Sequence, residues 1–190
     1  MKNLFLLLAS FSLTLAAAAQ TPTPPPTTLP DLPVKEGQLY YEGVVDVPAT
    51  AKQANLYRSS RSWFSGTYLG PKELELDDEA QGKLVGEGNC SYSFLTGLAN
   101  SHVFMHFTLA LEVKSGKCSY RLYNFEGSNT SSMKSGTTTR VRMIDYNQCY
   151  AAYKTDKRAR TAYNLSVLQG LNTQVQLLIV ALQKTLLTSP

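Results

Sequence analysis

The chain has 190 residues, a formal net charge of +4 at pH 7 and 43% hydrophobic residues. A charge this small does not indicate a nucleic-acid partner, and the length allows a single hydrophobic core in one domain. The three cysteines, Cys90, Cys118 and Cys149, have neither zinc-type nor Cys-x-x-Cys spacing, so no metal site or redox motif is expected.

Residues 1–19 have the pattern of a signal peptide. A basic start at Lys2 is followed by the apolar or small stretch 4–19, which ends in four alanines before Gln20. These sixteen residues fall short of the ~20 that a membrane-spanning helix needs. We therefore expect cleavage after Ala19 and an exported protein without a membrane anchor, either periplasmic, surface-associated or secreted.

Residues 20–35 are rich in proline and threonine. Because proline fixes φ and lacks a backbone N–H, this stretch is predicted to be a polyproline-like spacer outside helix and sheet. The single domain is then expected to cover residues 36–190.

The domain is predicted to start with a strand and a helix. Residues 39–47 alternate, with Leu39, Tyr41 and Val45 on one face, and Pro48 ends the strand. Thr50 and Gln53 have the spacing of a capping box at a helix start. This helix carries an apolar stripe and is expected to end at Gly70-Pro71 (the stripe is Leu56, Ser60, Trp63, Phe64 and Thr67).

A run of strands follows. Strong alternation covers residues 83–94 and 102–114, and a tight turn at 114–117 leads into 118–125. A shorter strand is predicted at 73–76, ending at the acidic turn 77–79. Strands joined this closely are antiparallel neighbours, which makes a meander.

The C-terminal region predicts a long amphipathic helix whose apolar stripe needs a partner (Leu165, Leu168, Leu171, Val175, Leu178, Ile179, Leu182 and Leu186). The open face of the sheet is the only large surface available to it. The expected fold is α+β: strand, helix, antiparallel meander, helix, with a curved sheet packed against the C-terminal helix.

Several segments resemble the domain of unknown function 4468, a family of exported bacterial proteins. They are the alanine-glutamine end of the signal peptide and the residue runs 39–48, 61–64, 82–88, 107–114 and 120–125. The resemblance implies a fold like that of the TATA-box-binding protein. It implies no activity and no site residues, and a fold name does not imply DNA binding.

Residues 126–162 form an insertion between the meander and the last helix, where a shorter link is expected. Residues 127–136 are expected to be exposed, and 137–146 alternate enough for an additional edge strand. Residues 127–160 hold seven basic and two acidic side chains, with tyrosines between them. Two interpretations stay open, a binding surface and a solvated mobile loop. The candidate binding residues are Arg140, Arg142, Tyr146, Tyr150, Tyr153, Lys157, Arg158 and Arg160.

The sequence does not favour an enzyme. His102 and His106 are ~13 Å apart along a strand, too far for one metal ion, and no nucleophile-elbow or phosphate-loop motif is present. No cofactor is expected. The primary hypothesis is an envelope binding module for an unknown polymer, peptide or protein. The alternatives are a structural or assembly component of the envelope and, less favoured, a hydrolase with a site outside known motifs.

The cysteines give one further expectation. If residues 139–149 return antiparallel to 118–125, Cys118 and Cys149 could approach each other. Cys90 lies two strands from Cys118, about 9.5 Å away and beyond bridging distance, and is expected to be a buried free thiol.

Overall fold

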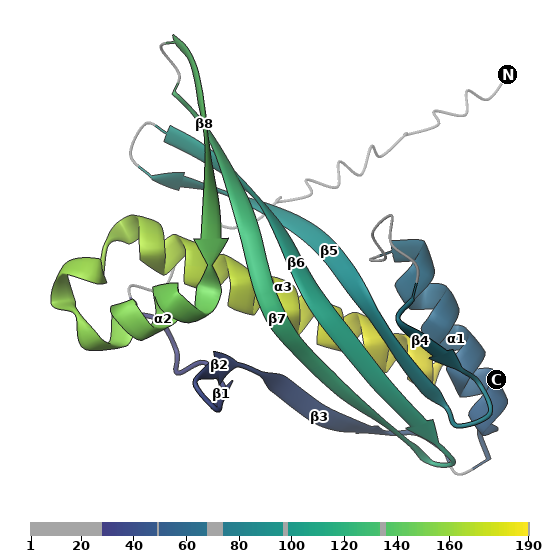
Figure 1. Cartoon of the computed structure of the whole chain (residues 1–190). Helices are drawn as coiled ribbons and strands as arrows, with labels where there is room; N and C mark the ends of the chain where they lie inside the picture. The colour runs from purple at the N-terminus through teal and green to yellow at the C-terminus, as the bar shows by residue number, and fades with distance from the viewer. Residues whose placement is uncertain (1–27, 49, 68–73, 97–98, 134–135, 190) are drawn as a thin grey trace, which may run out of the picture.

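The computed structural model describes residues 28–48, 50–67, 74–96, 99–133 and 136–189, with backbone alone for Thr67, 132–133 and 136–140. Residues 1–27, with the predicted signal peptide and the first half of the predicted spacer, lie outside this description. The main sheet is six-stranded and antiparallel, in the order β3-β7-β6-β5-β4, with β8 also paired to β7 (Figure 1). The strands are β3 (Tyr41–Asp46), β4 (Leu76–Asp78), β5 (Lys83–Thr96), β6 (Ala99–Lys114), β7 (Lys117–Met133) and β8 (Gly136–Asp145).

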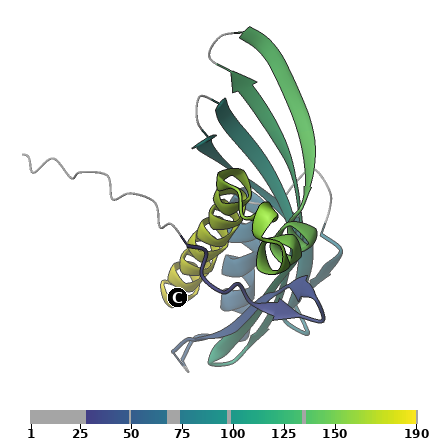
Figure 2. The same ribbon diagram turned by 90° about the vertical axis from the view of Figure 1, so that its left-hand side faces the viewer.

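The molecule has two layers. The sheet curves around the helices, which all lie on one of its faces, while the other face has no helix over it (Figure 2). The helices are α1 (Gln53–Thr67), α2 (Tyr146–Thr155), the 3-10 turn η1 (Lys157–Ala159) and α3 (Ala162–Leu187). The predicted α+β architecture, with a meander against a long C-terminal helix, is confirmed.

Alternation in β6 decides which face meets the helices. Every odd residue from Val103 to Val113 is buried in the core, as predicted, while Phe104 and His106 are exposed on the other face. The same alternation holds in β5, where Gly88 faces α1. A Cβ on Gly88 would lie 2.5 Å from the Phe107 ring and 3.0 Å from that of Phe64, so glycine permits the close packing of α1 on the sheet.

The helix α3 supplies the largest apolar surface beneath the sheet. Its N-cap is Thr161, whose side chain accepts a hydrogen bond from the Asn164 amide. Its predicted stripe is buried from Leu168 to Leu186, and α3 contacts α1, α2 and β5. Of the described helices, α3 meets the length and hydropathy of a membrane span, but 39% of that window is buried inside the domain.

Two local predictions are wrong. The helix α1 begins at Gln53, beyond the predicted capping position Thr50, because the carbonyl of Lys52 accepts the first helical hydrogen bonds. The acidic residues Asp77 and Asp78 belong to β4 and pair with β5. The turn comes later, at Gly82, whose φ of +68° a side chain would strain.

The described residues of the predicted insertion form strands and helices, which contradicts the interpretation of this segment as an irregular loop. The strand β7 does not end at Phe125 but continues to Met133, because β6 and β8 both pair with its second half. Serine and asparagine in this half are compatible with a strand once neighbours satisfy the backbone on both sides. Asn129 is buried, although exposure was expected for this segment. The predicted edge strand is β8, and it leads directly into α2.

The domain starts earlier than expected. Val34–Lys35 (β1) pairs with Gln38–Leu39 (β2), and Leu32 is buried. The backbone N–H of Leu32 donates to the Tyr150 hydroxyl over 3.1 Å, and Lys154 pairs with Asp31 at 2.6 Å. Asp31 and Leu32 therefore contact α2, and Val34 and Lys35 pair with β2, so these residues are not part of a spacer.

All three cysteines are free. The strand β8 pairs only with the second half of β7, starting opposite Glu126, so Cys118 is eight residues away, about 27 Å along the strand. Cys149 lies in α2, and the conditional Cys118–Cys149 approach does not occur. Cys90 is a free, partly buried thiol, and burial raises its pKa to about 11.

Candidate functional site

The structure divides the predicted binding residues into buried and exposed groups. Tyr146 and Tyr150 are 0% and 8% exposed, which excludes them as surface contacts. The Tyr146 hydroxyl lies 3.0 Å from that of Tyr92, which donates to the Val167 carbonyl at 2.8 Å. These tyrosines fix α2 against α3 and the sheet, so their role is structural.

The exposed candidates lie on two different elements. Arg142 projects from β8, with its guanidinium 5.4 Å from the centre of the Tyr163 ring. Lys157, Arg158 and Arg160 follow α2, and Arg160 is held by the Tyr153 carbonyl at 2.9 Å and lies over the Tyr153 ring. The Arg140 side chain lies outside the described residues. The exposed members of the sequence cluster with described side chains therefore lie on β8, on η1 and at the residue that follows it.

A different site is built around an irregularity in β7. The register between β6 and β7 shifts between His106 and Thr108, and Asn124 has a φ of +54°. This β-bulge gives β7 one extra residue opposite Phe107. As a result Tyr123 and Glu126 both reach the open face, while Phe125 between them is buried under the sheet.

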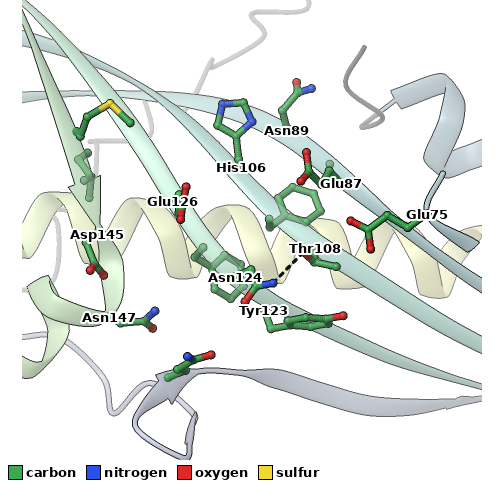
Figure 3. Close-up of a pocket in the computed structure, with 16 residues that line it drawn as sticks. Glu75, Glu87, Asn89, His106, Thr108, Tyr123, Asn124, Glu126, Asp145 and Asn147 are labelled. Atoms are coloured by element: carbon green, nitrogen blue, oxygen red, sulfur yellow. Dashed lines mark hydrogen bonds between the residues drawn. The ribbon is translucent and has the colours of Figure 1, made fainter. Parts of the chain in front are cut away.

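The bulge also coincides with a gap at the β7 edge. The strand β3 pairs with β7 as far as Leu122, and β8 starts pairing at Glu126. Between them lies a groove of about 970 Å³ on the open face, shown in Figure 3. Its polar lining comes from the residue before β4 and from β2, β5, β6, β7, β8 and α2 (Gln38, Glu75, Glu87, Asn89, His106, Thr108, Tyr123, Asn124, Glu126, Asp145 and Asn147).

The groove is acidic although the protein is basic overall. Four carboxylates line it, and none of the described lining residues is lysine or arginine. Side-chain amides from Asn89, Asn124 and Asn147 add donors and acceptors beside these carboxylates. Such a lining attracts cations and hydroxyl-bearing ligands and repels anions, the opposite of the basic site predicted from sequence.

Some of the groove is fixed by local hydrogen bonds. The Asn124 amide donates to the Thr108 hydroxyl over 3.3 Å, and Asn147 accepts from the Leu39 backbone at 2.7 Å. Asp145 caps α2 by accepting from the Gln148 amide. These contacts tie the bulge and the start of α2 to the strands on either side, so the lining is preorganised.

An aromatic pair borders the groove. The rings of Tyr123 and Tyr40 stack with centroids 5.7 Å apart, and the Lys35 ammonium lies 4.8 Å from the Tyr40 ring centre. Stacking holds the Tyr123 ring at the groove wall, where it offers an apolar surface beside polar groups. Binding sites commonly combine these two features.

The groove contains one histidine–acid pair. His106 on β6 lies directly across from Glu126 on β7, and no hydrogen bond joins them among the described contacts. The described lining includes no serine or cysteine. The arrangement offers polar contacts, and the described lining places no serine or cysteine nucleophile beside His106.

Sequence reasoning missed this groove because its residues come from distant segments. Two signals were present. Leu122 and Phe125 are both core residues three apart, which breaks strand alternation, and asparagine between them tolerates positive φ. Tyr146, Tyr150 and Tyr153 also have the i, i+4, i+7 spacing of a helix face.

Comparison with protein families matches residues 41–127 to the domain of unknown function DUF4468 with TBP-like fold. This part of the chain is a DUF4468 domain. The match covers β3, α1, β4, β5, β6 and the part of β7 that includes the bulge. It also includes most residues that line the groove. A search of curated proteins gives no match.

Two solved structures share the fold. A TBP-like protein from Parabacteroides distasonis ATCC 8503 superposes with a TM-score of 0.64 and 8% identity, over 83% of this chain and 98% of that one. A DUF4468 family protein from Bacteroides ovatus ATCC 8483 gives 0.54 and 14%, over 80% and 90%. At these identities the similarity establishes the TBP-like fold, and the DUF4468 domain takes no function from it.

Proposed function

We propose that the protein is an exported, non-enzymatic binding module of the cell envelope, and that the acidic groove holds its ligand. The observation that carries the proposal is a preorganised groove on the sheet face that has no helix over it. Export rests on the signal-peptide pattern of residues 1–19.

The lining favours an amine-bearing saccharide as the class of ligand. Carboxylates such as Glu87 and Glu126 suit an ammonium group, and the amides suit hydroxyls. The Tyr123 ring offers a flat apolar surface for the carbon–hydrogen face of a sugar ring. The same lining disfavours anionic polymers, because a bound anion would face four carboxylates and no lysine or arginine among the described lining residues.

The test is a titration of the full-length protein with glucosamine oligomers, followed by calorimetry and by amide chemical shifts. We expect shifts concentrated at the bulge residues 123–126 and on α2 near Asn147. Glu126→Gln should weaken binding by about tenfold or more, since a hydrogen bond to a charged group contributes roughly 1.5–3 kcal/mol.

Two controls make the result specific. Glu79→Gln removes an acidic side chain from the β4–β5 turn, outside the groove, and should leave binding unchanged. N-acetylated oligomers, which lack the ammonium group, should bind more weakly. Equal binding by both oligomers, or equal loss in both variants, would reject the amine-recognition proposal.

A second candidate function has an observation of its own. On α3, Leu177, Val180 and Leu187 are 56–58% exposed and share one helix face at spacings of three and seven. An exposed apolar stripe is typical of an interaction surface, which would suit an assembly component of the envelope. Light scattering of the full-length protein tests this: a monomer at high micromolar concentration would speak against self-assembly through α3.

A further inference from the structure

A second hollow lies on the helix-facing side of the sheet, where β7 and β8 pass the start of α3. It has a volume of about 440 Å³ and is lined by Asn129, Ser131, Val141, Arg142 and Tyr163. It shares no lining residue with the acidic groove. This hollow includes Arg142, which belongs to the basic set predicted from the sequence.

Asn129 is an unusual residue in this hollow. It is 4% exposed, and its Oδ1 has no hydrogen-bond partner within the described structure. The Nδ2 of the same amide donates to the Tyr163 hydroxyl over 3.0 Å, which fixes the side chain. A buried acceptor without a donor is unfavourable, so this position suits a ligand that brings an N–H or O–H group.

The position of Tyr163 leaves its hydroxyl proton available for a hydrogen bond to a ligand. The hydroxyl oxygen accepts from Asn129, which leaves its proton for another acceptor. The ring is fixed by an edge contact with Phe94 at 5.8 Å between centroids. Arg142, 5.4 Å from the same ring centre, makes no ion pair with any acidic residue in the described part of the chain.

These groups define a pattern of one acceptor beside several donors. The Arg142 guanidinium and the Tyr163 hydroxyl proton suit a carboxylate, which arginine binds through parallel hydrogen bonds. The Asn129 oxygen suits a hydroxyl next to that carboxylate. We propose that this hollow binds a uronic acid residue of an acidic saccharide, with its carboxylate on Arg142 and Tyr163 and a ring hydroxyl on Asn129.

The proposal is independent of the acidic groove, which has the opposite charge. A neutral sugar would satisfy Asn129 but leave Arg142 without an anion. A simple carboxylate such as acetate would satisfy Arg142 but leave the Asn129 oxygen without a donor. Recognition therefore requires both groups on one ligand.

The experiment is a calorimetric titration of the full-length protein with galacturonate dimers, repeated with galactose dimers and with acetate. We expect binding of the uronate alone. Arg142→Gln and Tyr163→Phe should each weaken it by about tenfold, because each removes a donor to a charged group. Since Arg142 is exposed and phenylalanine keeps the Tyr163 ring, both variants are expected to fold, which thermal melting confirms.

Arg158→Gln is the matched control, because Arg158 is an exposed arginine on η1 that does not line the hollow. It should bind the uronate as the parent protein does. Equal weakening by Arg158→Gln would show charge attraction without a site and overturn the proposal. So would equal binding of galactose dimers, or no binding of the uronate. Glu126→Gln, which alters the acidic groove, should have no effect on uronate binding.

Discussion

The two faces of the sheet are made by the same strands but differ in the kind of side chain they present and in its burial. On the helix-facing side, β5, β6 and the first half of β7 present mainly apolar side chains, most of which are buried in the core with α1 and α3. On the open side, the same strands present carboxylates, amides, His106 and exposed Phe104. The covered face therefore determines stability, while the open face can change chemically with little effect on folding.

The largest expected effect compares two phenylalanines on β6. Phe107 is 1% exposed and packs against Gly88, whereas Phe104 is 48% exposed on the open face. Phe107→Ala should reduce the free energy of unfolding by about 3–5 kcal/mol. Phe104→Ala should reduce it by about 1 kcal/mol or less, since it loses the His102 edge contact and little burial. Urea denaturation measures both, and similar losses would refute the distinction between the faces.

A smaller effect is expected for a buried hydroxyl on the covered face. Tyr92 donates to the Val167 carbonyl and lies within hydrogen-bond distance of Tyr146. Tyr92→Phe should lower the free energy of unfolding by about 1–3 kcal/mol, because polar partners stay buried without it. Tyr123→Phe is the open-face counterpart and keeps its stacking on Tyr40. Its change in a urea melt should stay below about 0.5 kcal/mol.

The next prediction concerns Asn124, the residue with positive φ in the bulge of β7. Asn124 has positive φ, so a β-branched side chain there is strained while glycine is not. Both Asn124→Val and Asn124→Gly lose the hydrogen bond to Thr108, but only valine is strained, so Asn124→Val should be less stable than Asn124→Gly by about 1–2 kcal/mol. Equal unfolding free energies for the two variants would contradict the backbone explanation.

The smallest effect on stability is expected for the exposed ion pair between Arg61 and Asp77, a residue of β4. The Arg61 guanidinium, 2.6 Å from Asp77, and then the Tyr57 hydroxyl lower the pKa of this carboxyl. A depressed pKa in the folded state adds stability above the unfolded-state pKa, and this is lost as pH falls through the folded value. Arg61→Gln should raise the Asp77 pKa, measured by NMR titration, and cost less than about 1 kcal/mol at neutral pH.

Arg58→Gln is the control for that titration. Arg58 pairs with Glu79 and not with Asp77. Its removal should leave the Asp77 pKa where it was. A matching rise in both variants would assign the effect to overall charge and not to the Arg61 contact.

The sequence predicted the covered face well because burial imposes periodicity. The alternation in β6 and the stripe of α3 follow directly from contact with a core on one side. The second half of β7 could not be recognised, since its serines and asparagines carry no apolar pattern. That half is a strand because β6 and β8 satisfy its backbone, which is a tertiary effect.

The candidate site was predicted poorly for the same reason. The basic residues and tyrosines are close in sequence, but the fold buries Tyr146 and Tyr150 and places Arg142 and Arg160 on different elements. The acidic groove joins residues from Gln38 to Asn147, and no local motif spans that distance. Only the asparagine at position 124, with core residues on both sides, marked its centre.

The contacts between residues 31–39 and α2 have a kinetic consequence. Leu32, Leu39 and Asp31 find their α2 partners 118, 108 and 123 residues further along the chain. Contacts of such sequence separation close late and slow folding, because a large loop must be ordered before they form. During synthesis, residues 31–39 therefore cannot form these contacts until α2 has left the ribosome. The domain becomes resistant to proteolysis only after most of its length has been synthesised.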